Sequence, residues 1–171
     1  MLIAVSFIVC YLIGSIPTGF LVAKYLKGID IREHGSGNVG ATNTARVVGK
    51  LPGLLVLTFD ILKGWVCVAL VAKLFIRLGV TVIEPNTYAL MLGSMAIIGH
   101  IWTVFLGFKG GKGIATSSGV FLGAAPKIFL IALAIWIAVF VWKRYVSLAS
   151  IIGAVSIPIM LSVMSYTPSF V

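Results

Sequence analysis

The sequence predicts an all-α integral membrane protein, a polytopic helix bundle. Of the 171 residues, 60% are hydrophobic and only 10% are charged, whereas a soluble domain is typically about 25% charged. The apolar residues gather in long stretches, and about 20 such residues cross the hydrocarbon core of a bilayer. Between the stretches lie short loops that hold most of the basic residues. We therefore expect a single transmembrane domain over residues 1–171.

Six membrane spans are expected. They cover residues 1–23, 51–72, 88–108, 114–126, 128–142 and 145–166. The first span contains Pro17, which is tolerated where neighbouring helices cover the bend. It is expected to be a span and not a cleaved signal peptide, because no positive residue precedes it and no clear cleavage site follows it. The fourth span is about 20 Å long at 1.5 Å per residue, so it crosses only with help from its flanks.

Several polar or reactive side chains fall inside the expected spans. Asp60 and Lys63 are three residues apart, so they can form an ion pair on one helix face. This ion pair is slightly favoured over a contact with substrate. His100 is expected to be a hydrogen-bonded helix residue rather than a catalyst. Cys10 and Cys67 are expected to be buried and reduced. Metal-ligand spacing is missing from the sequence, and we expect neither a metal nor a cofactor.

The formal net charge of +9 is carried by residues between the apolar stretches, where basic side chains orient a membrane protein and meet anionic lipid. We therefore expect membrane lipid, and not nucleic acid, as a partner. If residues 24–50 are cytoplasmic, alternation of the spans places nine basic residues inside and three outside (Lys73, Arg77 and Lys127). The amino terminus is then external.

The segment 107–113 reads Gly-Phe-Lys-Gly-Gly-Lys-Gly and precedes an expected helix start. Glycine allows sharp turns and close approach of backbone N–H groups, and a helix start attracts anions. We interpret the segment as a phosphate cradle in which Lys112 is catalytic and Lys109, Gly110, Gly111 and Gly113 bind substrate. A basic turn that only fixes topology is the alternative, and the density of glycines favours the cradle.

A second polar segment, residues 35–46, reads Gly-Ser-Gly-Asn-Val-Gly-Ala-Thr-Asn-Thr-Ala-Arg. Ser36 and Asn38 are expected to cap a short helix, on which Asn43 and Arg46 share a face with Thr42 nearby. An arginine grips a phosphate through two parallel N–H bonds. The alternative is an ordinary polar loop with a capping serine.

These residues carry a resemblance to a known family. The stretches 35–43 (GSGNVGATN) and 99–116 (GHIWTVFLGFKGGKGIAT) resemble the first two signature motifs of the bacterial acyl-phosphate:glycerol-3-phosphate acyltransferases of the PlsY type. Residues 147–151 (SLASI), after Lys143-Arg144-Tyr145, are also similar, so the resemblance covers nearly the whole chain.

The resemblance implies a membrane enzyme of bacterial phospholipid synthesis with an external amino terminus and an active site on the cytoplasmic face of the inner membrane. Its reaction moves an acyl group from acyl phosphate to the 1-hydroxyl of glycerol 3-phosphate, giving 1-acyl-glycerol 3-phosphate and inorganic phosphate. The family has seven helices, the last ending in a His-Arg-x-Asn type motif. Six spans are counted before Val171, so we expect a domain truncated at its carboxyl terminus.

Within such a reaction the departing phosphate needs charge stabilisation, which Lys112, Lys109 and Arg46 supply. Ser36 is expected to act with them, and Asn38, Thr42 and Asn43 to orient phosphate oxygens. The resemblance implies that a substrate phosphate, and not a protein base, accepts the hydroxyl proton. Direct transfer is expected, because no Ser or Cys lies beside a plausible base.

Three other functions would place different demands on the sequence. An ATP-binding loop needs a glycine at position 106 and a hydroxyl residue at 113, where the chain has Leu106 and Gly113. An acyltransferase of the His-x4-Asp type needs an aspartate at position 105, which is Phe105. A phosphate or organic-anion transporter remains as the alternative, although such proteins typically show related halves and none is found.

Overall fold

The computed structural model describes residues 1–164, and every regular element in that range is helical. This confirms the all-α expectation. The helices are α1 (Leu2–Ser15), α2 (Thr18–Lys27), α3 (Ala41–Val47), α4 (Lys50–Val66), α5 (Ala72–Arg77), α6 (Pro85–Ile101), α7 (Ile114–Ala124), α8 (Pro126–Lys143) and α9 (Val146–Met164). A π-turn (Cys67–Val71) joins α4 to α5, and short 3₁₀ turns cover Ile31–Glu33 and Val104–Leu106.

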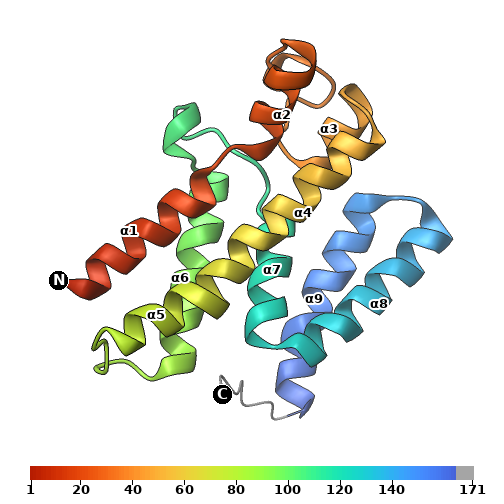
Figure 1. Cartoon of the computed structure of the whole chain (residues 1–171). Helices are drawn as coiled ribbons and strands as arrows, with labels where there is room; N and C mark the ends of the chain where they lie inside the picture. Colours follow the sequence, from red (N-terminus) through yellow and green to blue (C-terminus); the bar gives the residue numbers. More distant parts are fainter. Residues whose placement is uncertain (165–171) are drawn as a thin grey trace.

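Within residues 1–164, five helical segments are long and apolar enough to cross a membrane, instead of the six that the sequence predicts. They cover Leu2–Lys27, Lys50–Arg77, Pro85–Leu106, Pro126–Lys143 and Val146–Val163. The sixth expected span is the 11-residue helix α7, which is apolar but shorter than these. Figure 1 shows α7 beside α4 and α6, between the segment that follows α6 and the turn that precedes α8. The last expected span reaches Tyr166, and its end lies outside the described residues.

The first span is not one continuous helix, because the chain bends at Ile16 and Pro17 between α1 and α2. A proline disfavours helical geometry in the residue before it, and Ile16 has an extended ψ of 113°. The bend leaves the carbonyl of Ile16 without a helical partner, and Lys63 Nζ donates a hydrogen bond to it at 3.1 Å. A neighbouring helix therefore covers the bend, as the sequence predicts.

Glycines bring two pairs of helices into close contact. Gly14 and Gly99 lie where α1 crosses α6, and Gly64 and Gly119 lie where α4 crosses α7. A Cβ atom at any of the four would collide with a backbone carbonyl oxygen of the facing helix. These helices therefore touch backbone to backbone, as is common inside membranes. The crossing of α4 and α7 holds the short helix in the bundle.

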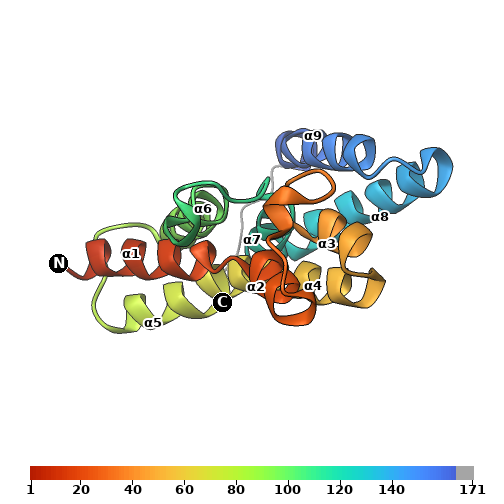
Figure 2. The same cartoon turned by 90° about the horizontal axis from the view of Figure 1, so that it is seen from above.

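The main core lies among α1, the α4–α5 segment, α6 and α7, with the helices α8 and α9 packed against each other at the edge away from α1 (Figure 2). Cys10 and Cys67 are buried and free, as expected. Tyr88 is fully buried, and its hydroxyl donates to Ser6 Oγ at 2.6 Å. The Trp136 indole donates to Ser150 Oγ at 3.2 Å and ties α8 to α9.

The two ends of the bundle differ in what they carry. Helix α3, the segment between α6 and α7, and the turn between α8 and α9 lie at one end in Figure 1. The loop between α5 and α6 and the turn between α7 and α8 lie at the other. Both segments that the sequence singles out therefore share one end.

Candidate functional site

The first loop, residues 35–40, leads into helix α3, and the N-cap of that helix is not the expected one. Helix α3 begins at Ala41 with Gly40 as its N-cap, and no side chain caps it. Ser36 is exposed and lies too early to cap the helix. Asn38 instead closes a turn, because its Oδ1 accepts the Gly40 N–H at 2.8 Å. The prediction that Ser36 and Asn38 cap the helix is therefore wrong.

Asn43 holds the first loop together from the inside. Its side chain is buried, and Oδ1 accepts the backbone N–H of Ser36 at 2.9 Å. Nδ2 donates to the carbonyls of His34 and Asn38 at 3.0 Å each, and to that of Ile31 at 3.4 Å. All of these hydrogen bonds of the Asn43 amide are to the backbone of residues 31–38, so Asn43 fixes the conformation of the first loop.

On α3, Thr42 and Arg46 form the exposed pair. The sequence suggests that Asn43 and Arg46 share a face, but Asn43 is buried and Arg46 is exposed. Thr42 lies four residues before Arg46, on the same side of the helix, and is exposed as well. Within residues 1–164 the Arg46 guanidinium has no hydrogen bond or ion pair. It is free to meet an anion.

The second loop, residues 102–113, leaves the end of α6 through a 3₁₀ turn. Thr103 starts this turn, and its hydroxyl donates to the Ser15 carbonyl at 2.5 Å, which anchors the loop to α1. Gly107 and Phe108 both adopt left-handed conformations, with φ of 63° and 62°. Gly113, with φ of 78°, is the N-cap of α7. Glycine suits such angles because it has no Cβ to clash.

Gly110 and Gly111 pack against the end of α6. Their N–H groups donate to the carbonyls of Ile101 at 2.9 Å and His100 at 3.0 Å. A Cβ atom at Gly110 would collide with the His100 carbonyl oxygen, and one at Gly111 with the His100 ring. The expectation that these two amides point at a ligand is therefore corrected, because both bind α6. Close packing explains why glycine stands at both positions.

Lys109 and Lys112 lie on either side of this glycine pair and are exposed. Neither ammonium group has a hydrogen bond or ion pair with any residue of the described chain. Directly after Lys112, helix α7 begins without a side-chain cap. The first N–H groups of such a helix carry partial positive charge. Two full positive charges therefore lie beside a helix start.

The two loops share an apolar base. Val39 of the first loop and Leu106 of the second are buried in one cluster with Ala23 and Ile31. Phe20 of α2 packs against the same cluster. The fold therefore brings together two segments that lie far apart in the sequence and that are both predicted from it to bind phosphate.

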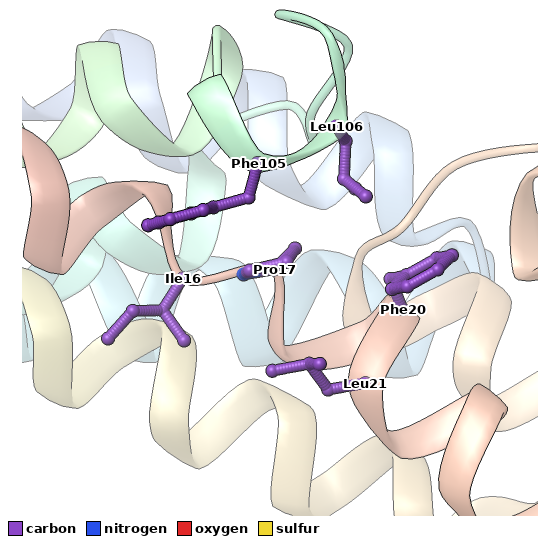
Figure 3. A pocket seen from close by; sticks show the side chains of 6 residues that line it. All are labelled: Ile16, Pro17, Phe20, Leu21, Phe105 and Leu106. Atoms are coloured by element: carbon purple, nitrogen blue, oxygen red, sulfur yellow. The ribbon is translucent and has the colours of Figure 1, made fainter.

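An apolar pocket of about 320 Å³ lies beside this base (Figure 3). It is lined by Ile16, Pro17, Phe20, Leu21, Phe105 and Leu106. Figure 3 shows Phe105 and Leu106 across the pocket from the bend between α1 and α2. Sequence reasoning missed this pocket, although the proline in the first span and the Phe-Leu pair before Gly107 were signals for it.

Below the loops lies a buried polar group of side chains, which we call the Asp60 cluster (Thr18, Asp60, Lys63 and His100). Asp60 Oδ1 accepts hydrogen bonds from Thr18 Oγ1 at 2.5 Å and from Lys63 Nζ at 2.8 Å. His100 Nδ1 lies 3.7 Å from the same oxygen. The predicted ion pair of Asp60 and Lys63 is confirmed. Sequence reasoning did not connect Thr18 or His100 to it.

Comparison with known proteins identifies the family. Residues 4–171 match the family model described as glycerol-3-phosphate acyltransferase. The chain belongs to this family. A relative named glycerol-3-phosphate acyltransferase 2, from Moorella thermoacetica, is 47% identical over 153 residues, covering 90% of this chain and 74% of the relative. A glycerol-3-phosphate acyltransferase from Chlorobium limicola is 46% identical over 161 residues, covering 92% of this chain and 68% of the relative.

A solved structure supports the same conclusion. The crystal structure of PlsY (YgiH), an integral membrane glycerol 3-phosphate acyltransferase in its glycerol 3-phosphate form, matches with a TM-score of 0.83 and 41% identity. The match covers 96% of this chain and 78% of that chain. The resemblance inferred from the two motifs is confirmed, and so is the integral membrane helix bundle. The comparisons give no support to the transporter alternative.

Proposed function

We propose that the protein is a membrane acyltransferase that moves a fatty acyl group from acyl phosphate to the 1-hydroxyl of glycerol 3-phosphate. One observation of the structure carries the proposal. Arg46, Lys109 and Lys112 have no anionic partner within residues 1–164, and they flank one apolar base at one end of the bundle. Family membership supports the acceptor, because solved relatives are described in glycerol 3-phosphate and lysophosphatidic acid forms.

The positive charges suit a reaction in which both substrates carry phosphate. Acyl phosphate is a mixed anhydride, so its phosphate departs once the growing negative charge is stabilised. Lys112 at the start of α7 is the main stabiliser, with Lys109 beside it. Arg46 holds a phosphate through two N–H bonds, and the exposed hydroxyls of Thr42 and Ser36 orient its oxygens.

The transfer needs no base from the protein. Asp60 and His100 are buried and engaged in the Asp60 cluster, which removes them as bases for a substrate at the loops. The acceptor hydroxyl oxygen attacks the acyl carbon, the bond from that carbon to the phosphate oxygen breaks, and a phosphate oxygen takes the hydroxyl proton. The products are 1-acyl-glycerol 3-phosphate and inorganic phosphate.

The apolar pocket gives the acyl chain a place beside the charged loops. Leu106 lines this pocket and immediately precedes Gly107, where the glycine-rich segment begins. A fatty acyl chain lying in the lipid phase reaches the pocket while its phosphate head remains at the polar end. We place this end of the bundle at the cytoplasmic face of the bacterial inner membrane, because most basic residues gather there.

Product formation by the full-length protein in detergent tests the proposal. With acyl phosphate and radiolabelled glycerol 3-phosphate, we expect labelled 1-acyl-glycerol 3-phosphate and one inorganic phosphate per product molecule. Acyl-CoA as the donor is expected to give no product. A comparable rate with acyl-CoA would contradict the proposed donor, and absence of product with every donor would contradict the acyltransferase activity.

A further inference from the structure

The Asp60 cluster joins α2, α4 and α6, and the mechanism above does not use it. Asp60 and Lys63 come from α4, Thr18 from α2 and His100 from α6. The side chains of Asp60, Lys63 and His100 are each no more than 7% exposed. Burying charges is costly, so buried ion pairs inside a membrane commonly serve function or fix the arrangement of helices.

On one side the cluster reaches the first loop. Thr18 is bound to Asp60, and the next residue, Gly19, lies against the backbone of the first loop. A Cβ atom at Gly19 would collide with the Val39 carbonyl oxygen and would lie 3.0 Å from Thr44 Oγ1. Helix α2 therefore transmits the position of Asp60 to the first loop through rigid backbone contact.

On the other side the cluster reaches the second loop through His100. The three atoms nearest to a Cβ placed on Gly111 all belong to the His100 imidazole. The backbone of Gly111 also donates to the His100 carbonyl at 3.0 Å. The Nε2 edge of the ring therefore lies against the glycine. Lys109 and Lys112 flank the glycine pair that this contact supports.

We propose that His100 is a positioning residue: its ring, seated against Asp60, supports the Gly110–Gly111 segment and so sets Lys109 and Lys112 at the correct place relative to the first loop. The inference rests on the proposed function, because it assigns those lysines to substrate phosphate. His100 itself touches no reacting atom. Its effect passes through the backbone that carries the lysines.

A double-mutant cycle on the full-length protein tests the contact. The variants are His100→Ala, Gly111→Ala and the pair, with kcat and KM for glycerol 3-phosphate measured on each. Residues in contact show coupling, so we expect Gly111→Ala to lower kcat/KM by about tenfold or more alone but by less than about threefold beside His100→Ala. Gly111 has an ordinary negative φ, so the ring is the obstacle to alanine there.

Gly110→Ala is the matched control. Its Cβ atom would meet the carbonyl oxygens of His100 and Ile101, which remain when the His100 side chain is removed. The defect of Gly110→Ala should therefore be of similar size with and without His100→Ala. A cycle that couples His100 to Gly111 but not to Gly110 identifies the ring as the contact.

The pattern of kinetic constants separates positioning from folding. His100→Ala should raise KM for glycerol 3-phosphate about tenfold, because displaced lysines bind phosphate less well. Loss of folded protein alone would lower the apparent kcat and leave KM unchanged. If His100→Ala yields no folded protein, His100→Asn replaces it in the cycle, since the shorter side chain also vacates the space beside Gly111.

Two results would overturn the inference: an equal penalty for Gly111→Ala in both backgrounds, or an unchanged KM in the His100 variant. Either is distinguishable from failure of the proposed function, in which the unsubstituted protein already forms no acylated product. The role of His100 is therefore tested only on variants of an enzyme that is active without substitution.

Discussion

At the residue scale, Lys112 is the side chain on which the proposed chemistry most depends. It is exposed, has no partner within the described chain, and stands one residue before the N-cap of α7. Removing one stabiliser of a departing anion typically lowers the rate about 10²–10³-fold. We expect Lys112→Ala to reduce kcat by that amount, and Lys112→Arg to restore part of it, because a planar guanidinium does not replace a compact ammonium.

The control for this prediction is Lys127→Ala, which removes a lysine from the start of α8, at the other end of the bundle. It should leave kcat within about twofold of the unsubstituted protein, because a surface substitution far from the site has little effect. Lys112→Ala that inserts correctly and keeps most of its activity would show that the lysine only fixes topology.

Asn43 supports a second prediction, one of stability. In Asn43→Asp, a carboxylate oxygen would replace the Nδ2 group that donates to the carbonyls of His34 and Asn38. Leaving buried polar groups unsatisfied costs about 1–3 kcal/mol each, so the free energy of unfolding should fall by about 3 kcal/mol. Thermal unfolding in detergent measures this. Thr42→Ala, at the exposed neighbouring position, should change it by less than about 0.5 kcal/mol.

Contacts between side chains were predictable where spacing along one helix decides them. Asp60 and Lys63 are three residues apart, and the structure has the ion pair that this spacing predicts. The partners of Gly111 and Asn43 were not predictable, because these contacts form only after the chain has folded back on itself. Gly111 meets a histidine of the preceding helix, and Asn43 meets carbonyls of the loop before it. Glycine density alone suggested ligand contact where the cause is packing.

At the element scale, the lengths of the apolar stretches predict where the spans lie but not where the helices within them are interrupted. The bend at Pro17 divides the first span, and the carbonyl it frees is satisfied by Lys63 from a different helix. A single-sequence pattern carries no information on such a partner. The same holds for α7, which is short by length alone and held in the bundle by its close crossing with α4.

That crossing leads to a third prediction. Gly119→Ala would drive a Cβ atom into the Ile61 carbonyl oxygen, and overpacking of this kind typically costs about 1–3 kcal/mol. We expect a lower midpoint of thermal unfolding together with reduced acyltransferase activity, since α7 begins at the candidate site. Gly153→Ala is the matched control, because a Cβ atom at Gly153 would meet only ordinary contacts at 3.6 Å and beyond. A Gly119 variant as stable as the Gly153 variant would contradict the close crossing.

At the scale of the whole molecule, the placement of both loops at one end was predictable from the alternation of the spans. The segment after α6 at one end of the bundle leads into α7, and α7 leads to the turn before α8 at the other end in Figure 1, so the alternation is preserved although the length of α7 is not typical of a span. The shared apolar base of Val39 and Leu106 was not predictable, because neither residue differs in type from those facing lipid. Only the folded chain separates the two environments.

The side of the membrane that this end faces gives the last prediction. Ser36 and Lys109 are exposed positions of the two loops and are replaced by cysteine one at a time. Val82, which is 81% exposed in the loop between α5 and α6, is replaced by cysteine as the position at the other end. Because basic residues favour the cytoplasmic side, a membrane-impermeant maleimide should label Val82→Cys in intact cells and the other two only in inverted vesicles. The unsubstituted protein should remain unlabelled, since Cys10 and Cys67 are fully buried. Labelling of Ser36→Cys and Lys109→Cys from outside would invert the proposed orientation, whereas labelling of the two from opposite sides would exclude a shared site.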